Sequence, residues 1–516
     1  MSKHRQRIDA EYQQGQNLHA AGRMAEADRV YRSILAVEPE HADSLHMLGV
    51  LALQTDQPAA ALAWLDQAVN AAPSAALIHA HRANALLALG RAAEAEAACR
   101  VGLGYRGDCV EAWRTLAQAL SGMRQYADAV EACERVRSLD PQAPQAHNEL
   151  GLALGRANRQ AEAVATFQRA LRLYPDDDVI RGNLANAFKE AGRPREAKTV
   201  YRAMLARAPD DVVTRFNMGI VLLLAERFQE GWPEWECRFQ ADPALIWDDA
   251  RPFWRGEPLA GRALLLHGEQ GLGDMIQFAR YLPLLPRDGQ VVLRVQAPLV
   301  RLLSGIAGVD RLVALDDPVP EATIRCGAMS LPFLFGLPRP EDCPTPIPYL
   351  VPDPGMAARW RDRMAALPGL KVGLAWAGNP DPARMGWRRS VPVERLAGLG
   401  DVPNVSLISL QKGIPVTGPL ADRVVDWTSE LGDLADTAAL VAGLDLVISV
   451  DTSVAHLAGA LGRPVWALIR ADPCWRWGLG REDSAWYPTL RQFRQDVAGS
   501  WDAPIARVCE ALRRPG

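Results

Sequence analysis

The sequence predicts a multidomain protein in which an all-α array of helical repeats is followed by an α/β domain built on parallel sheets. Two observations predict this fold class. In the first part of the chain, helix breakers and small residues recur at a spacing of 34 residues, which is typical of stacked helix pairs. From Gly261 onward, short β-branched or leucine-rich segments alternate with helical ones, which is typical of parallel sheets covered by helices.

The composition excludes several classes of protein. The chain has 516 residues, too many for one ordinary core, and its formal net charge of -4 argues against a nucleic-acid partner, which needs a basic face. No apolar run approaches the ~20 residues of a transmembrane helix, and the charged start of the chain does not resemble a secretory signal. The 8 cysteines form no C-x-x-C pair, so neither a zinc nor a redox motif is indicated. We therefore expect a cytoplasmic protein with reduced thiols and no transmembrane segment.

The repeat pattern consists of four columns with one residue per unit. The helix breakers are Pro39, Pro73, Gly107, Pro141, Pro175 and Pro209, and the column before them holds only alanine, at Ala27, Ala61, Ala95, Ala129, Ala163 and Ala197. Larger side chains form the third column, at Tyr31, Leu65, Cys99, Cys133, Phe167 and Tyr201. Small residues form the fourth, at Gly15, Gly49, Ala83, Ala117, Gly151 and Ala185. We interpret the small residues as close helix crossings, the larger ones as plugs and the breakers as helix ends.

Six such units cover about residues 8–211, and a degenerate seventh carries Gly219 and Trp235 in the small and plug columns. We therefore assign residues 1–225 to a repeat domain, and its pattern resembles the tetratricopeptide repeat. The groove of such an array more often binds a peptide or protein than a small molecule. We expect a protein or peptide partner there. The alternative is an array that serves only as a spacer or dimerisation arm.

Residues 226–260 form a junction rich in tryptophan and proline. The tryptophans are Trp232, Trp235, Trp247 and Trp254, and the prolines that interrupt a long helix are Pro233, Pro243, Pro252 and Pro258. A flexible linker would be polar and rich in glycine or serine. We therefore expect this segment to pack between the two halves of the chain. The alternative is that its tryptophans only cap the last repeat.

The α/β half contains seven expected strands, at residues 263–267, 291–295, 312–315, 371–376, 405–410, 444–450 and 464–469. Helices are expected between them, for example over residues 274–285 and 434–443. The proline-rich residues 338–354 separate two sets of strands, so we assign two Rossmann-like lobes, 261–345 and 346–516. Ligands bind such sheets at the carboxyl ends of the strands, which predicts a site in the cleft between the lobes.

The first loop at an expected strand end runs from His267 to Asp274 and is rich in glycine. Gly271 and Gly273 allow the backbone to pass close to a ligand, and the following helix offers its first amides. The loop does not have the G-x-G-x-x-G spacing of a dinucleotide fold. For Asp274, the alternative to a functional role is that it caps the helix.

Two further loops carry groups suited to phosphate. Residues 376–380 are followed by Arg384, Arg388, Arg389 and Ser390, and guanidinium groups bind phosphate oxygens in pairs. The alternative is an exposed basic loop. In the third loop, Asp451, Thr452 and Ser453 end a strand and begin a helix that carries His456, an arrangement that suits a pyrophosphate. The alternative there is helix capping, with His456 a partly buried helical residue.

The order of these motifs resembles that of a known enzyme family. GLGD, WAGNP with its arginines, SLQKG and SVDTSVAHLAGALGRPVWALI follow one another as in the heptosyltransferase-like glycosyltransferases of family 9, over about residues 261–510. The arrangement of repeats before a two-lobed domain is also similar to that of protein O-GlcNAc transferases. The resemblance implies a GT-B fold, which needs no catalytic metal and no cofactor beyond the nucleotide-sugar donor.

The resemblance also implies roles for individual residues. Asp274 matches the proposed general base, and Gly271 and Gly273 are expected beside the sugar nucleotide. Arg389 stands where heptosyltransferases have a phosphate-binding lysine, and Lys412 of SLQKG is a further phosphate ligand. The residues of the third loop match the motif that holds the sugar nucleotide: Asp451, Thr452, Ser453 in place of the family's glycine, and His456.

These patterns predict a glycosyltransferase of the hexosyl or heptosyl type that moves a sugar from a nucleotide sugar to a protein or glycan acceptor without a metal. The repeats are expected to recruit the acceptor. The alternative is a non-catalytic repeat scaffold whose degenerate transferase domain binds a nucleotide. A sugar-nucleotide epimerase of the same two-lobed fold is a further alternative, although repeats would be unusual there.

Overall fold

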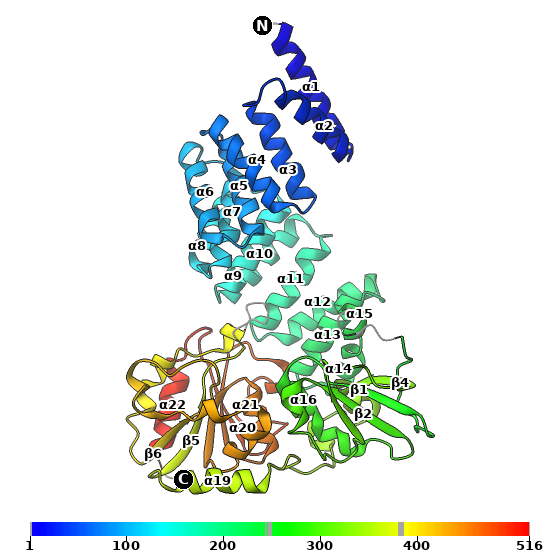
Figure 1. Cartoon of the computed structure of the whole chain (residues 1–516), viewed down its shortest axis with the longest axis vertical. Coiled ribbons are helices and arrows are strands. Elements are labelled where there is room, and N and C mark those ends of the chain that lie inside the picture. Colours follow the sequence, from blue (N-terminus) through cyan, green and yellow to red (C-terminus); the bar gives the residue numbers. More distant parts are fainter. Residues whose placement is uncertain (1–2, 243–244, 246–249, 380–385, 515–516) are drawn as a thin grey trace. The chain divides into compact units, whose positions relative to one another are not determined.

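The computed structural model describes residues 3–242, 245, 250–379 and 386–514 (Figure 1). The chain divides into two compact units, Met1–Glu190 and Ala191–Gly516. The first unit is all-helical, and the second joins the last repeat helices to an α/β region. No helix in the described part of the chain is long and apolar enough to cross a membrane.

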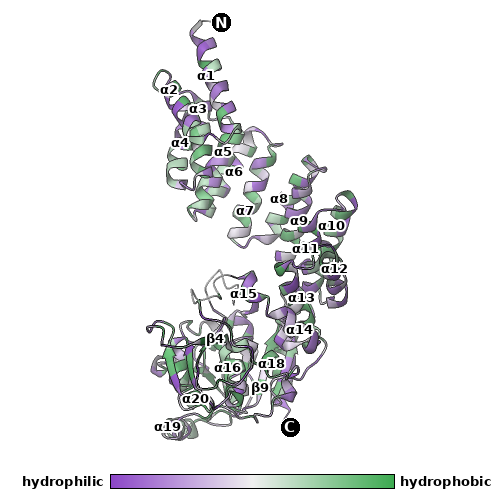
Figure 2. Ribbon diagram, turned by 90° about the vertical axis from the view of Figure 1, so that its right-hand side faces the viewer, coloured by the Kyte–Doolittle hydropathy of each residue, from purple (hydrophilic) through white to green (hydrophobic). Residues whose placement is uncertain are grey.

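The first unit consists of antiparallel helices that pair as the repeat period predicts. The helices are α1 (Lys3–Ala20), α2 (Met24–Leu35), α3 (Ala42–Gln54), α4 (Pro58–Ala71), α5 (Ala76–Ala88), α6 (Ala92–Tyr105), α7 (Val110–Gly122), α8 (Tyr126–Leu139), α9 (Pro144–Arg156), α10 (Gln160–Leu173) and α11 (Asp178–Glu190). They alternate hydrophobic and hydrophilic residues along their length (Figure 2), which is typical of helices buried on one side.

The small column of the repeat lies where the two helices of a unit cross. A Cβ atom added to Gly49 would lie 2.4 Å from the Leu65 side chain, and one added to Gly151 would lie 2.4 Å from Phe167. No real Cβ contact is that short, so the plug residue fills the space that the missing side chain leaves. In these units the small column and the plug column of the sequence are therefore in direct contact.

The second unit begins with the last repeat helices, which are α12 (Pro194–Arg207), α13 (Val212–Leu224), α14 (Phe228–Trp235) and the short α15 (Arg238–Ala241). Trp232, Trp235 and Trp254 are buried in the same apolar cluster as both sheets. The Trp232 indole donates a hydrogen bond of 2.7 Å to the Pro338 carbonyl, and Trp235 also packs on Phe216 of α13. The described junction therefore both caps the last repeat and packs on the α/β region. Pro243 and Trp247 lie outside the described residues.

The α/β region contains two sheets in which every strand pair is parallel. The four-stranded sheet has the order β3-β2-β1-β4, with β1 (Ala263–His267), β2 (Gln290–Val295), β3 (Arg311–Ala314) and β4 (Ile324–Gly327). The six-stranded sheet has the order β10-β9-β8-β5-β6-β7, with β5 (Leu370–Ala375), β6 (Val405–Ser409), β7 (Val424–Val425), β8 (Leu446–Val450), β9 (Val465–Ile469) and β10 (Leu490–Arg494). All seven expected strands are present, and β4, β7 and β10 were not predicted.

Helices pack against these sheets, and α16, α17 and α21 begin a few residues after the carboxyl ends of β1, β2 and β8. They are α16 (Leu272–Phe278), α17 (Ala297–Val300), α18 (Leu331–Leu334), α19 (Pro354–Ala365), α20 (Leu434–Val441), α21 (Ser453–Ala460) and α22 (Asp502–Arg513). The helix expected over residues 274–285 is α16 followed by a 3-10 helix that contains Pro283. An all-α tetratricopeptide solenoid followed by two parallel-sheet lobes is the predicted fold class, and the architecture is consistent with a GT-B-like domain.

Candidate active site

The loops at the carboxyl ends of β1, β5, β6, β8 and β9 line one cavity of about 680 Å³. The nine residues to which the family resemblance assigns a role all lie on its wall: Gly271, Gly273, Asp274, Arg389, Lys412, Asp451, Thr452, Ser453 and His456. Parallel strands place their carboxyl ends at one edge of a sheet, which is where such sheets bind ligands. The two lobes of the second unit therefore bring together residues that lie up to 185 positions apart, from Gly271 to His456.

Asp274 holds the start of α16 and also faces the cavity. Its Oδ2 accepts a hydrogen bond of 2.8 Å from the Gly271 amide, so the carboxylate caps the helix. Its Oδ1 lies 2.5 Å from Nη2 of Arg476. The capping role is therefore real, but it uses only one of the two carboxylate oxygens.

Gly273 is where α16 of one lobe meets α21 of the other. A Cβ atom on Gly273 would lie 2.7 Å from His456 Cδ2 and 3.3 Å from the Ser453 Cα. The first distance is shorter than real Cβ contacts, so a residue without a side chain is needed for the two helices to approach this closely. Gly273 thus sets the spacing of the two lobes beside the cavity.

His456 is 4% exposed, and its environment decides its charge. Its Nδ1 shares a hydrogen bond of 3.0 Å with the Tyr487 hydroxyl, and its ring stacks on Trp477 at 5.2 Å between centroids. Burial lowers the pKa of His456 to about 4, because a low-dielectric environment disfavours the charged form. At neutral pH His456 therefore acts through hydrogen bonding and packing, not as a cation.

Arg389 lies over the end of the β5 loop, close to the start of α21. Its Nη1 is 3.6 Å from Asp451 Oδ2, and a Cβ on Gly378 would lie 2.9 Å from its Nε. That Nε is buried and has no hydrogen-bond partner among the described residues. Thr452, one residue after Asp451, shares a hydrogen bond of 3.1 Å with Ser449.

The other members of the arginine cluster do not join Arg389. Arg388 pairs with Asp472 at 3.3 Å and is not among the described residues that line the cavity. Ser390 accepts a hydrogen bond of 3.0 Å from the Gly378 amide, which shapes the loop. Pro380 and Arg384 lie outside the described residues. Among the described members of this cluster, Arg389 is therefore the one that lines the cavity.

Lys412 reaches the opposite wall of the cavity. Its ammonium donates to the Leu431 carbonyl and, at 3.0 Å, to the Gly432 carbonyl. The preceding Gln411 accepts hydrogen bonds from the backbone amides of Trp376 and Ala377, at 3.1 and 2.8 Å. Because Gln411 ties the loop after β6 to the loop after β5, it positions the two basic segments relative to each other.

Arg476 is the main site residue that the sequence analysis missed. It lies on a 3-10 turn, Trp475–Trp477, after β9, and it is 8% exposed. Burial by itself would lower the pKa of Arg476, but Asp274 raises it above its ordinary value, so the side chain is a cation. An arginine flanked by two tryptophans at the end of a strand was the available signal, since aromatic neighbours indicate burial.

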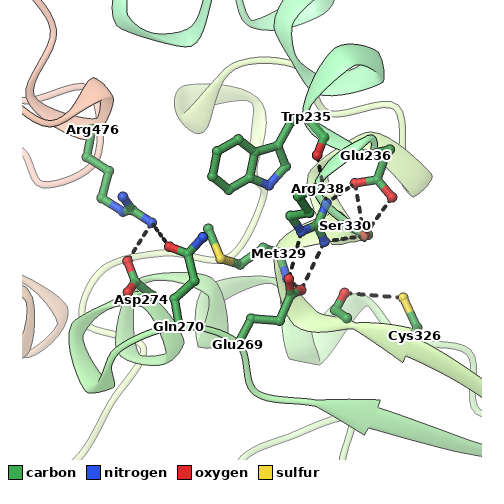
Figure 3. Close-up of polar contacts among 11 residues, drawn as sticks. Trp235, Glu236, Arg238, Glu269, Gln270, Asp274, Cys326, Met329, Ser330 and Arg476 are labelled. Atoms are coloured by element: carbon green, nitrogen blue, oxygen red, sulfur yellow. Dashed lines mark hydrogen bonds and ion pairs between the residues drawn. The ribbon is translucent and has the colours of Figure 1, made fainter. Parts of the chain in front are cut away.

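A second buried arginine supports the same loop from the other side. Arg238 of α15 pairs with Glu269, which precedes Gln270 in the glycine-rich loop, through contacts of 2.7 and 3.0 Å. Arg238 also donates to Glu236 and to Ser330, each of which contacts the other (Figure 3). Burial would lower the pKa of Arg238, but Glu269 and Glu236 raise it. The glycine-rich loop is thus held between two buried guanidinium groups.

Family models match stretches in both parts of the chain. Tetratricopeptide repeat models match residues 12–76, 114–178 and 156–228. The model of glycosyltransferase family 9 (heptosyltransferase) matches residues 431–495, a stretch that contains Asp451, His456 and Arg476. The chain therefore contains tetratricopeptide repeats and a C-terminal region of the family 9 type, which supports a glycosyltransferase at the level of the family.

One curated relative and several solved structures are similar to parts of the chain. Protein FlbA of Caulobacter vibrioides is 33% identical over 334 residues, which cover 57% of this chain and 54% of FlbA. The chain thus spans about half the length of this relative. A tetratricopeptide repeat protein of Parabacteroides merdae is 13% identical, with a TM-score of 0.39, and covers 47% of this chain and 96% of its own. MamA of Desulfovibrio magneticus RS-1 is 19% identical, with a TM-score of 0.30, and covers 33% of this chain and 97% of its own.

Proposed function

We propose that this chain is a glycosyltransferase of the hexosyl or heptosyl type that moves a sugar from a nucleotide-sugar donor to a protein or glycan acceptor without a metal ion. The observation that carries the proposal is the cavity, because loops from both lobes contribute the nine residues to which the family resemblance assigns a role. The match of residues 431–495 to glycosyltransferase family 9 supports the same reaction class.

In this reaction the acceptor hydroxyl attacks the anomeric carbon of the donor sugar, and the nucleoside diphosphate leaves with the electrons of the broken bond. Asp274 is the general base that takes the hydroxyl proton. A base must come within about 3 Å of that proton's oxygen in the reactive complex. The position of Asp274 on the cavity wall supports this role.

The negative charge that develops on the leaving group is stabilised by cationic side chains and the first turn of α21. Arg389 and Lys412 are the candidates from the sequence, and fixed cations in a partly enclosed site stabilise such charge strongly. His456, neutral at neutral pH because of its lowered pKa, contributes a hydrogen bond at most. Within the described residues, no three His, Cys, Asp or Glu side chains are grouped to hold a metal ion, and the binding experiment below tests metal independence directly.

The repeats are proposed to recruit the acceptor. Tetratricopeptide repeats are present, and the grooves of such arrays bind extended or helical polypeptides. A protein acceptor is therefore the first choice, with a glycan carried by a protein as the second.

A non-catalytic nucleotide-binding scaffold is the second candidate, and one observation favours it. Both carboxylate oxygens of Asp274 have partners, Gly271 and Arg476, whereas a general base needs a free lone pair in the reactive complex. This alternative predicts nucleotide binding without turnover.

Titration calorimetry of the full chain with ADP, GDP, UDP and CDP, in EDTA and in magnesium, tests the proposal. We expect at least one nucleotide to bind equally well in both buffers. Slow hydrolysis of the corresponding sugar nucleotides, followed by release of the diphosphate, then separates an enzyme from a scaffold. Binding of none of the four nucleotides, or binding in magnesium only, would contradict the proposal.

A further inference from the structure

Arg476 joins the two lobes inside the cavity. It belongs to the lobe of the six-stranded sheet, yet its guanidinium contacts Gln270 and Asp274 of the other lobe (Figure 3), and Gln277 as well. We propose that Arg476 binds the donor diphosphate by exchanging partners: the diphosphate takes the place of the Asp274 carboxylate and thereby frees Asp274 to accept the acceptor's proton. This inference rests on the proposed function, since it requires a nucleoside diphosphate donor.

The contacts of Arg476 are single hydrogen bonds to different groups. Nη2 lies 2.5 Å from Asp274 Oδ1, Nε donates to Gln277 Oε1 at 2.9 Å, and Nη1 donates to the Cys474 sulfur at 3.0 Å. Sulfur is a weak acceptor, and a guanidinium binds most strongly when two parallel N–H groups meet two oxygens. A phosphate supplies such a pair of oxygens, so it can compete with the single contact to Asp274.

Asp274 stays in position when that contact is lost. Its Oδ2 accepts the hydrogen bond of 2.8 Å from the Gly271 amide, which does not involve Arg476. The exchange therefore removes the partner of Oδ1 only, and this is the oxygen that then accepts a proton. Donor binding and availability of the base are coupled through one side chain.

The backbone that carries Arg476 is held on both sides. Trp475 lies 4.3 Å below the guanidinium and makes edge contacts with Trp232 and Trp486 at 5.6 and 6.0 Å between centroids. Trp477 stacks on His456 at 5.2 Å. A rearrangement is therefore confined to the arginine side chain, which needs only rotamer changes.

The acids on the cavity wall compete with a bound diphosphate for the cations there. The described lining of the cavity contains the cations Arg389, Lys412 and Arg476 and, in equal number, the acids Asp274, Asp433 and Asp451. A diphosphate adds more than one negative charge. To bind it, a cation must either contact both the diphosphate and its present acidic partner or leave that partner. Arg476 and Asp274 form the close pair, at 2.5 Å, whereas Arg389 and Asp451 are 3.6 Å apart.

Affinity for a nucleoside diphosphate tests the exchange, because competition predicts effects of opposite sign. The probe is whichever of ADP, GDP, UDP and CDP the wild type binds most tightly. Asp274→Asn keeps the cap but removes the competing charge, so affinity should rise about 10-fold, the lower range for a charge-assisted hydrogen bond. Arg476→Gln should lower affinity by about 10- to 100-fold. In the double variant, Asp274→Asn should give no gain over Arg476→Gln alone.

Asp472→Asn is the matched control. It removes a carboxylate that is 10% exposed and pairs with Arg388 and Arg470, in the lobe of Arg476 but outside the described lining of the cavity. Its nucleotide affinity should equal that of the wild type. If Arg476→Gln does not fold, Arg476→Lys takes its place. Lysine keeps the positive charge but lacks the paired N–H donors of the guanidinium, so this variant should also bind the nucleotide more weakly than the wild type.

The outcomes separate this inference from the proposed function. Unchanged or weaker affinity in Asp274→Asn, or an equal gain in the Asp472→Asn control, overturns the exchange while nucleotide binding by the wild type stands. If the wild type binds none of the four nucleotides, the proposed function fails and the exchange fails with it.

Discussion

Arg238 and Glu269 form a bidentate ion pair in which neither side chain is exposed to solvent. Arg238 follows the last repeat helix pair, and Glu269 lies in the glycine-rich loop of the cavity. Met329 completes the arrangement, since its amide donates a hydrogen bond of 3.0 Å to Glu269. The segment after the repeats therefore positions a loop of the candidate active site.

Glu269→Gln should destabilise the second unit by about 3 kcal/mol, because a buried guanidinium loses its buried anionic partner and Arg238 keeps only the partly exposed Glu236, at 2.6 Å, as an ion-pair partner among the described residues. Chemical denaturation followed by tryptophan fluorescence measures this change. The control is Glu482→Gln, which breaks an ion pair with Arg491. In that pair the Arg491 side chain is 52% exposed and the Glu482 side chain 76% exposed. That change should cost at most about 1 kcal/mol. If the two substitutions lower the free energy of unfolding equally, the buried pair contributes no more to stability than the exposed one.

Asp274→Asn should lower turnover by about 10²–10⁴-fold if Asp274 is the general base. Donor hydrolysis or transfer to an acceptor measures it. From the sequence alone, asparagine would replace aspartate as a helix cap at little cost. The structure changes that expectation. In Asp274→Asn the buried Arg476 loses its anionic partner, so the melting temperature should fall. Tight nucleotide binding by the variant would show that it is folded, and full activity in such a protein would rule out the base role.

Arg389→Ala should weaken nucleoside diphosphate binding by about 1.5–3 kcal/mol, the range for hydrogen bonds to charged groups. The structure supports this expectation through the position of Arg389 on the cavity wall. Arg388→Ala is the neighbouring control, because Arg388 pairs with Asp472 instead. Calorimetry compares the two variants. A loss of the same size in both would indicate a general effect of charge rather than a contact with phosphate.

Acid should destabilise the protein through His456. Its pKa is lowered to about 4 in the folded chain against about 6.5 unfolded, so between these values the unfolded chain binds the proton and the folded chain does not. Stability is therefore full above about pH 6.5 and falls as the pH drops toward 4, by about 3 kcal/mol in total.

The pH dependence of the melting temperature, compared between the wild type and His456→Gln, measures this contribution. The variant should show a smaller decrease on acidification. It keeps part of the slope, because burial also lowers the pKa of His46 in the repeats to about 4. Parallel curves for the two proteins would contradict the buried, neutral state of His456.

Gly273→Ala should destabilise the second unit by about 1–3 kcal/mol, since overpacking forces neighbours apart. The added Cβ would meet His456 at 2.7 Å, where α16 and α21 touch. Gly355→Ala in α19 is the control, because its Cβ would have an ordinary contact of 3.4 Å with Asp353. Thermal unfolding compares them. A neutral effect of Gly273→Ala would mean that the lobes can separate without cost.

The repeat period could be recognised from the sequence, because every unit places a small residue 16 positions before a plug residue, and in the structure such a pair is a local contact, as between Gly49 and Leu65. The seven expected strands could also be recognised from the sequence, because buried parallel strands are continuous apolar runs. β4, β7 and β10 could not. β4 and β10 carry the charged residues Arg325, Arg491 and Arg494, and β7 has only two residues.

The sequence by itself determined which loops carry the candidate chemistry, because strand ends and helix starts are marked by local signals such as the glycines before Asp274. Only the tertiary structure decided how those groups meet. Arg476 lies 202 positions after Asp274, and it contacts this carboxylate because two parallel sheets bring the ends of β1 and β9 to one cavity. The low pKa of His456 and the pairing of Arg238 with Glu269 were decided in the same way, since burial depends on what packs around a residue and not on its neighbours in the chain.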